Sequence, residues 1–212
     1  IRVVDATSYG VVAALPLEIG CTPASKEAKW RWLSAPEGPA DGRTSVGIYV
    51  SGTLATVDLF LEFSGKGFTA RSPPVTVGHG GGPVLFALPN IWSEAGEADV
   101  RLFSTSNVEI LYAAACGSQT FHFQAGWTSL DISQGIAGGG TTITVGGYGF
   151  DGSNHIYSCD FLTSDSDVPV ARVYGEVIDH RRLKCLTPNW NEQTLRSSVS
   201  VLEGHKQLPF TG

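Results

Sequence analysis

The chain has 212 residues, of which 42% are hydrophobic and 16% are charged, and its formal net charge at pH 7 is −6. This composition excludes a disordered tail, and the scattered Lys and Arg side chains exclude a basic surface that neutralises a row of phosphates, so no nucleic-acid partner is expected. No apolar run approaches the roughly 18 residues needed to cross a bilayer, so the sequence predicts no membrane-spanning segment.

The amino-acid composition favours strands over helices. The sequence contains 26 glycines and 11 prolines, and its charged fraction lies well below the usual quarter. Short strands joined by tight turns have this composition, so the expected fold class is all-β. We expect residues 1–20 to be an edge strand or the tail of a preceding domain.

A period-two pattern runs from residue 46 to residue 123. In its clearest stretch, five alternate side chains are expected to face the core: Ala55, Val57, Leu59, Leu61 and Phe63. The side chains between them, Thr56, Asp58 and Glu62, are expected to face the solvent. Gly and Pro clusters at 64–67, 72–74 and 78–83 mark the turns between such strands. The pattern predicts a β-sandwich domain over residues 21–126.

A second series of short strands begins at Trp127, and we place a domain boundary immediately before it. Strands are expected at 129–133, 141–147, 156–161, 170–175, 182–188 and 197–203. Glycines between residues 135 and 150 supply tight turns, and Phe150 is expected to fill the gap between two sheets. The two domains are therefore expected to be β-sandwiches in tandem.

Several motifs of this second half follow one another in a characteristic order. They are Gly139-Gly140-Thr141, the strand from Ile143 to Val145, the turn 147–150, Cys159, and Cys185 followed by Pro188. The ordered set resembles the IPT/TIG family, the immunoglobulin-like module of cell-surface receptors and other extracellular proteins. The resemblance covers residues 127–212 and implies an immunoglobulin-like sandwich. Gln134 departs from it, because the family commonly has a proline there, and this affects the local turn.

Four cysteines are present, and no two of them form a C-x-x-C pair, which argues against a zinc or redox motif. Of the three possible pairings we expect Cys21 with Cys116 and Cys159 with Cys185, because each bridge then stays within one expected domain. Two disulfides indicate an oxidising compartment. The alternative is four buried free thiols in a cytosolic protein.

Three short motifs suggest a function that the surrounding residues do not support. Residues 147–152 satisfy G-x-G-x-x-G, but a strand rather than a helix is expected after them, so no nucleotide site is predicted. Residues 79–82, HGGG, match an oxyanion-hole loop, but there is no G-x-S-x-G nucleophile, so a hairpin loop is predicted. Residues 208–212, LPFTG, match a sortase tag but lack its apolar helix and basic tail, so a final strand is predicted.

Candidate ligand-binding residues are few. Asp160, Asp165 and Asp167 offer oxygen ligands for calcium, but their spacing fits no known calcium loop, so neither a metal nor a cofactor is expected. His155, His180 and His205 lie far apart in sequence and form no predicted ligand set. Three tryptophans either anchor the first core or stack on a sugar: Trp30, Trp32 and Trp92.

The sequence shows no catalytic constellation, so we expect no enzyme. The leading hypothesis is an extracellular structural or adhesion module of a larger cell-surface, matrix or filament protein. Its partners would be other protein domains or copies of the same chain along a fibre, docked at edge strands. The alternative is a carbohydrate-binding module, or accessory domains of a secreted glycoside hydrolase.

Overall fold

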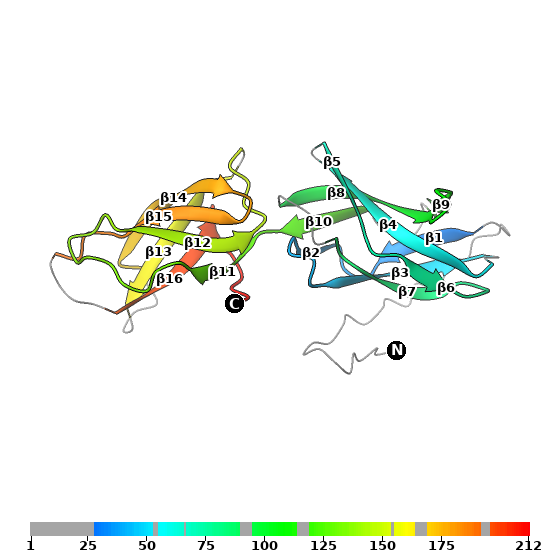
Figure 1. The fold of residues 1–212 in the computed structure, drawn as a ribbon, viewed down its shortest axis with the longest axis horizontal. Coiled ribbons are helices and arrows are strands. Elements are labelled where there is room, and N and C mark those ends of the chain that lie inside the picture. Colours follow the sequence, from blue (N-terminus) through cyan, green and yellow to red (C-terminus); the bar gives the residue numbers. More distant parts are fainter. Residues whose placement is uncertain are drawn as a thin grey trace. The chain divides into compact units, whose positions relative to one another are not determined.

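The computed structural model describes residues 28–52, 55–65, 67–89, 95–113, 119–153, 155–163, 169–191 and 196–212. These residues form strands and turns and contain no helix (Figure 1). The all-β prediction is therefore confirmed. Two compact units are present, the first with most described residues up to His122 and the second with Phe123–Gly212, Pro39–Asp41 and Ala95. The N-terminal segment 1–20 lies outside the described residues.

The first ten strands lie mainly in the first unit. They are β1 (Lys29–Leu33), β2 (Glu37–Pro39), β3 (Ser45–Ser51), β4 (Val57–Gly65), β5 (Phe68–Arg71), β6 (Val75–Val77), β7 (Gly82–Ala87), β8 (Gly96–Ser104), β9 (Glu109–Tyr112) and β10 (Thr120–Gln124). Their hydrogen-bonded order is β2-β10-β8-β9-β1-β3-β7, and β4 pairs with β5, β6 and β8. Because β9 pairs with both β8 and β1, it joins the layer around β4 and β8 to the layer around β1, β3 and β7.

The core of the first unit follows the expected alternation. On β3 the buried side chains are Val46, Ile48 and Val50, and on β4 they include Leu59, Leu61 and Phe63. Each such side chain contributes about 1.5–3 kcal/mol when it is fully buried. Phe63 also packs edge-to-face on Phe121 of β10, with ring centroids 5.8 Å apart. The strand period in the sequence therefore identified the inward face of these two strands.

Two side chains depart from the expected pattern of β4. Ala55 precedes the strand and is exposed, because β4 begins only at Val57. Phe60 lies on the outward face and is nevertheless only 6% exposed. Its ring is stacked on Phe103 at 5.8 Å, and the guanidinium of Arg71 lies 4.7 Å from its centroid. Neighbouring strands thus cover a residue that local alternation leaves in solvent.

The second unit contains the remaining seven strands. They are β11 (Gly126–Leu130), β12 (Thr142–Tyr148), β13 (Tyr157–Thr163), β14 (Ala171–Asp179), β15 (Arg182–Leu186), β16 (Ser197–Glu203) and β17 (Lys206–Gln207). Their order is β11-β12-β15-β14-β13-β16-β17, with antiparallel neighbours throughout. Each of the six expected strands of this half overlaps one of these elements.

Strand β14 belongs to both layers of the second unit. Its residues from Ala171 to Gly175 pair with β13, and those from Glu176 to Asp179 pair with β15. The change of partner occurs at Gly175, where the strand lies close to the buried side chain of Leu183 on β15. A Cβ atom on Gly175 would lie 2.9 Å from Leu183 Cδ1 and 3.0 Å from its Cγ. The crossing therefore depends on a residue without a side chain.

We predict that Gly175→Ala destabilises the second unit by about 1–3 kcal/mol, because Leu183 has no free space into which it can move. Urea unfolding, monitored by hydrogen exchange in peptides from β13 and β15, measures the free energy of unfolding of this unit. The matched control is Gly138→Ala, since a Cβ at that position meets no atom within 4 Å. Equal stabilities of the two variants would contradict the close approach.

Candidate functional site

A cluster of polar side chains follows the turn after β12. Gly149 adopts a φ of 73°, and the next side chain, Phe150, is buried between the layers. Phe150 packs edge-to-face on Tyr157 at 5.4 Å, as expected for a residue that fills the gap between two sheets. This packing places Asp151 directly above the core.

The carboxylate of Asp151 is 1% exposed. Oδ1 accepts hydrogen bonds from the backbone N–H of Ser153 at 2.9 Å and from the Ser153 hydroxyl at 2.6 Å. A side chain that bonds the backbone two residues later forms a local turn. Residues 147–152 therefore end in a turn that leads into β13, and no helix N-terminus is available there for a pyrophosphate.

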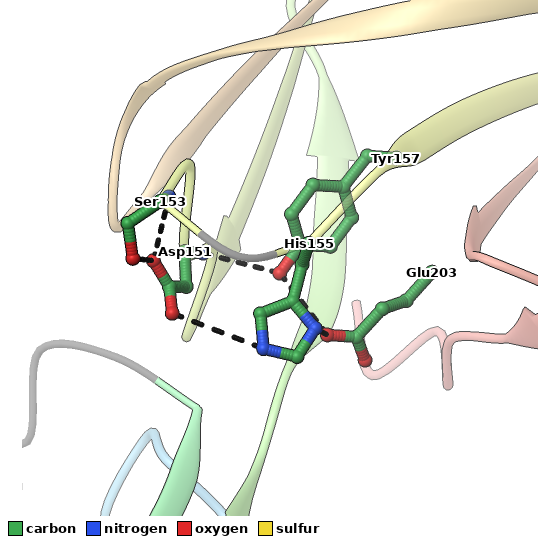
Figure 2. A network of polar contacts seen from close by, with 5 residues as sticks. All are labelled: Asp151, Ser153, His155, Tyr157 and Glu203. Carbon is green, nitrogen blue, oxygen red and sulfur yellow. Dashed lines mark hydrogen bonds and ion pairs between the residues drawn. The ribbon is translucent and has the colours of Figure 1, made fainter.

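His155 bridges this carboxylate and a second one (Figure 2). Its Nδ1 lies 2.6 Å from Glu203 Oε1 on β16, and its Nε2 lies 3.8 Å from Asp151 Oδ2. The imidazole becomes a charged partner of both groups only when it is protonated. Through His155 the turn after β12 is tied to the end of β16.

Tyr157 completes the cluster that we call the Asp151 network: Asp151, Ser153, His155, Tyr157 and Glu203. The Tyr157 hydroxyl accepts a hydrogen bond from Asp151 N at 3.1 Å and donates one to Glu203 Oε1 at 3.4 Å. Burial raises the pKa of Tyr157 above its ordinary value. The hydrogen bond from Asp151 N opposes this shift, whereas the charges of Glu203 and Asp151 add to it.

The chemistry of the Asp151 network is that of a brace. The Ser153 hydroxyl donates to Asp151, and the two imidazole nitrogens face carboxylates. The polar atoms thus bond one another and join the turn to two strands.

Two other sequence motifs also belong to the scaffold. Residues 79–81 connect β6 to β7, and residue 82 begins β7. Because β6 pairs with β4 whereas β7 pairs with β3, this connection is not the hairpin loop that we predicted. The turn 139–141 packs on the segment after Cys185: Gly140 N donates to Thr187 O at 2.9 Å, and Thr187 N donates to Thr141 O at 2.8 Å. Gly139 has a φ of 80°, and a Cβ there would lie 2.7 Å from the Pro188 carbonyl. This contact joins the G-G-T turn to the C-x-x-P segment.

The segment 208–212 is built into the second unit. Leu208 is buried and donates its N–H to Val201 O at 2.8 Å. Trp127 N donates to Pro209 O at 3.0 Å, and the rings of Trp127 and Phe210 lie 4.5 Å apart. The segment thus connects β16 to β11. Its pairing with β11 is one isolated bridge, between Trp127 and Phe210, rather than the full strand that we predicted.

Cys159 and Cys185 form a disulfide between β13 and β15, with a Cα–Cα distance of 6.4 Å. The two strands lie in different layers, and both cysteines are buried in the core between them. The bridge joins two cysteines that we expected to pair. These two residues are therefore not the free thiols of the alternative. Cys21 and Cys116 lie outside the described residues.

The calcium candidate Asp160 already has a partner. Its carboxylate is buried and accepts hydrogen bonds from Arg172 Nε at 2.6 Å and Arg172 Nη2 at 2.7 Å. The same contact raises the pKa of Arg172. Asp165 and Asp167 are not among the described residues, and the part of the chain that is described holds no group of three or more His, Cys, Asp or Glu residues that suits a metal ion.

The stacking role considered for Trp30 does not agree with the structure. Its indole is 1% exposed and packs edge-to-face on Tyr112 at 4.7 Å, so no ring face is open to a sugar. Trp30 is a core residue, which was the other interpretation of the sequence. The side chain of Trp32 and the whole of Trp92 lie outside the described residues.

Sequence reasoning missed the Asp151 network. The three histidines 155, 180 and 205 were compared only with one another, and the structure leaves His180 and His205 exposed. Tyr157 and Glu203 are separated by 46 residues, so no local spacing relates them. One usable signal was the order Asp-x-Ser after the Gly-x-Gly-Phe turn, which is typical of a side-chain-stabilised turn.

Comparison with known proteins identifies the second half of the chain. Residues 127–211 match the family described as IPT/TIG domain, so the C-terminal part is an IPT/TIG domain, as the resemblance implied. No family matches the N-terminal part. None of the curated proteins matches the chain. No helix of the described residues is long and apolar enough to span a membrane.

Two solved structures are similar to larger parts of the chain. The full extracellular region of plexin A4, domains 1 to 10, has 15% identity and a TM-score of 0.32, and the match covers 84% of this chain and 15% of that one. A tetra-tandem repeat in the extending region of a large adhesion protein has 8% identity and a TM-score of 0.34, with 86% and 49% covered. The chain therefore spans only 15% and 49% of the lengths of these two structures.

Removal of the disulfide is predicted to lower the stability of the second unit. For a sequence separation of 26 residues, the chain-entropy account gives about 3.5 kcal/mol. We expect Cys159→Ala/Cys185→Ala to lower the free energy of unfolding of the second unit by this amount. Urea unfolding monitored by hydrogen exchange in β13 and β15 tests it, and a loss below about 1 kcal/mol would show that the bridge constrains little.

The raised pKa of Tyr157 predicts a dependence of stability on alkaline pH. Unfolded tyrosine titrates near pH 10, and the folded chain retains this proton to higher pH. The contribution is fully present below about pH 10 and is lost as the pH rises above it. Urea midpoints from about pH 8 to 11 should fall less steeply in Tyr157→Phe than in the unchanged chain. Tyr174→Phe, which alters an exposed ring, should leave the slope unchanged.

Proposed function

We propose that the chain is a non-enzymatic extracellular module of a larger cell-surface, matrix or filament protein, and that it acts through contacts with other protein domains or copies of itself. The division into a sandwich at 21–126 and an IPT/TIG domain at 127–212 belongs to this proposal. The disulfide in the core of the second unit supports maturation in an oxidising compartment. The brace-like chemistry of the Asp151 network supports a role without catalysis.

The observation that carries the proposal is an exposed apolar strip on the outward side of β14 and β15. Tyr174 is 81% exposed, and three aliphatic side chains on these strands or next to them are exposed as well: Val170, Ile178 and Leu186. Along β14, Tyr174 and Ile178 alternate with less exposed neighbours, so both point away from the core. Large apolar side chains gathered on a surface are typical of interaction sites.

Charged side chains beside this strip have partners on the same strand, on the adjacent strand or in the turn between them. Arg172 bonds Asp160, Lys184 Nζ lies 3.0 Å from Glu176 Oε2, and Arg182 Nη2 lies 2.7 Å from Asp179 Oδ2. A surface whose charges neutralise one another repels neither an acidic nor a basic partner. The strip therefore suits contact with another folded domain, where aromatic side chains contribute most of the binding energy.

Cross-linking on intact cells with a membrane-impermeant reagent tests both the location and the contact. We expect adducts of the parent protein on unpermeabilised cells, and fewer of them in Tyr174→Ser/Ile178→Ser. The control Leu85→Ser alters an equally exposed side chain of the first unit and should leave the adducts unchanged. Adducts that form only after permeabilisation, or that persist in the double variant, would refute the proposal.

A further inference from the structure

The second unit contains a pocket of about 860 Å³ between its two layers. The layer of β11 and β12 contributes Leu130 and Ile143, and the layer of β13 and β16 contributes Phe161 and Val199. The segment 132–137 and Trp190 form its remaining walls. A volume of this size lies within the range of ligand-binding pockets.

The C-terminal segment bridges β16 and β11 at residues that do not line the pocket. The segment 208–211 bonds Val201 on one side and Trp127 on the other. The segment 132–137, which lines the pocket, is anchored by two hydrogen bonds. Ile136 N donates to Thr141 Oγ1 at 3.1 Å, and Trp190 N donates to Ala137 O at 2.9 Å.

The edge of β16 beside the pocket has no strand partner among the described residues. Along its whole length β16 pairs with β13, whereas β17 pairs only with Leu202 and Glu203. Residues 197–200 therefore present unpaired backbone groups next to the pocket that Ser197 and Val199 line. Such an edge accepts an additional extended strand.

The walls of the pocket suit a bulky apolar side chain. Trp190 is half-buried and packs edge-to-face on Phe161, with ring centroids 6.0 Å apart. Ile136 lies at the rim and is 67% exposed, so an occupant would remove its side chain from water. Polar side chains also line the pocket, namely Ser133, Gln134, Thr187 and Ser197. The aliphatic and aromatic part of the lining is the part that suits an apolar side chain, and the polar part suits the backbone of an extended segment.

The charge of the pocket defines a second feature of the occupant. Arg196 is the one ionisable residue among its described lining residues, and no described carboxylate lines it. On a chain with a net charge of −6 this is a locally positive site. Guanidinium groups bind carboxylates through two parallel hydrogen bonds.

We propose that an extended segment of a partner protein adds to the free edge of β16, inserts one bulky apolar side chain between the layers, and pairs a nearby carboxylate with Arg196. This inference rests on the proposed function, because it names the chemistry of one partner of the module. It differs from the contact at β14, since it uses main-chain hydrogen bonds at an edge rather than a sheet face.

A blocked heptapeptide, acetyl-Ser-Thr-Leu-Thr-Glu-Thr-Ser-amide, is the probe. Its Leu and Glu side chains lie on the same face of a strand. Titrated into the isotopically labelled 212-residue chain at up to about 5 mM, it should produce saturable NMR shifts at the amides of 197–200 and at the Trp190 indole. Peptides with Ala in place of Leu, or with N-methyl groups on the strand-pairing amides, should not saturate.

The carboxylate contact is tested with matched arginine variants. We expect Arg196→Gln to weaken binding of the peptide about fivefold, as an exposed charge-assisted pair does. Arg181→Gln changes an exposed arginine outside the pocket and should bind as the unchanged chain does. Equal affinities in the two variants would remove the assigned role of Arg196.

Two outcomes would overturn the proposal as a whole. One is the absence of saturable shifts with the Leu-Glu peptide, and the other is saturation of the pocket by sodium decanoate alone, which would indicate a free amphiphile rather than a polypeptide. Neither outcome bears on the cross-linking test. Adducts that depend on Tyr174 and Ile178 would sustain the proposed function even where the pocket inference fails.

Discussion

The second unit depends on the contact between its two layers at the Cys159–Cys185 bridge. Facing sheets bury their apolar sides against each other, and a covalent link between β13 and β15, with a Cα–Cα distance of 6.4 Å, joins the two layers. Phe150 and Tyr157 belong to the same core cluster. Because β14 pairs with one layer and then the other, its glycine at position 175 must lie directly against Leu183.

The polar chemistry of the chain follows from this packing. Tyr157 enters the core from β13, so its hydroxyl meets the turn that contains Asp151. A buried carboxylate needs hydrogen-bond donors, and Ser153 supplies two of them. His155 and Glu203 then complete a set of contacts whose members bond one another. Residues 147–152, which match a nucleotide-binding motif in the sequence, thereby end in a turn that leads into β13.

Much of the local structure could be predicted before any coordinates. Alternation on β3 and β4 identified their buried faces, and the glycine and proline clusters identified the turns between strands. The ordered G-G-T, cysteine and C-x-x-P motifs indicated the IPT/TIG domain. Phe60 and Asp160 could not be placed in this way, because an aromatic stack and an arginine from neighbouring strands bury them.

Residue order alone therefore establishes the strands, the turns and the family of the second half, since each of these depends on neighbours within a few positions. The tertiary fold decides the rest: which distant side chains form the Asp151 network, that Trp30 belongs to a core, and that one end of β16 keeps an unpaired edge beside a pocket. These features depend on strand order and on the path of the segment 208–211. Neither is encoded in any local pattern, because strands that pair are brought together by burial over the whole unit.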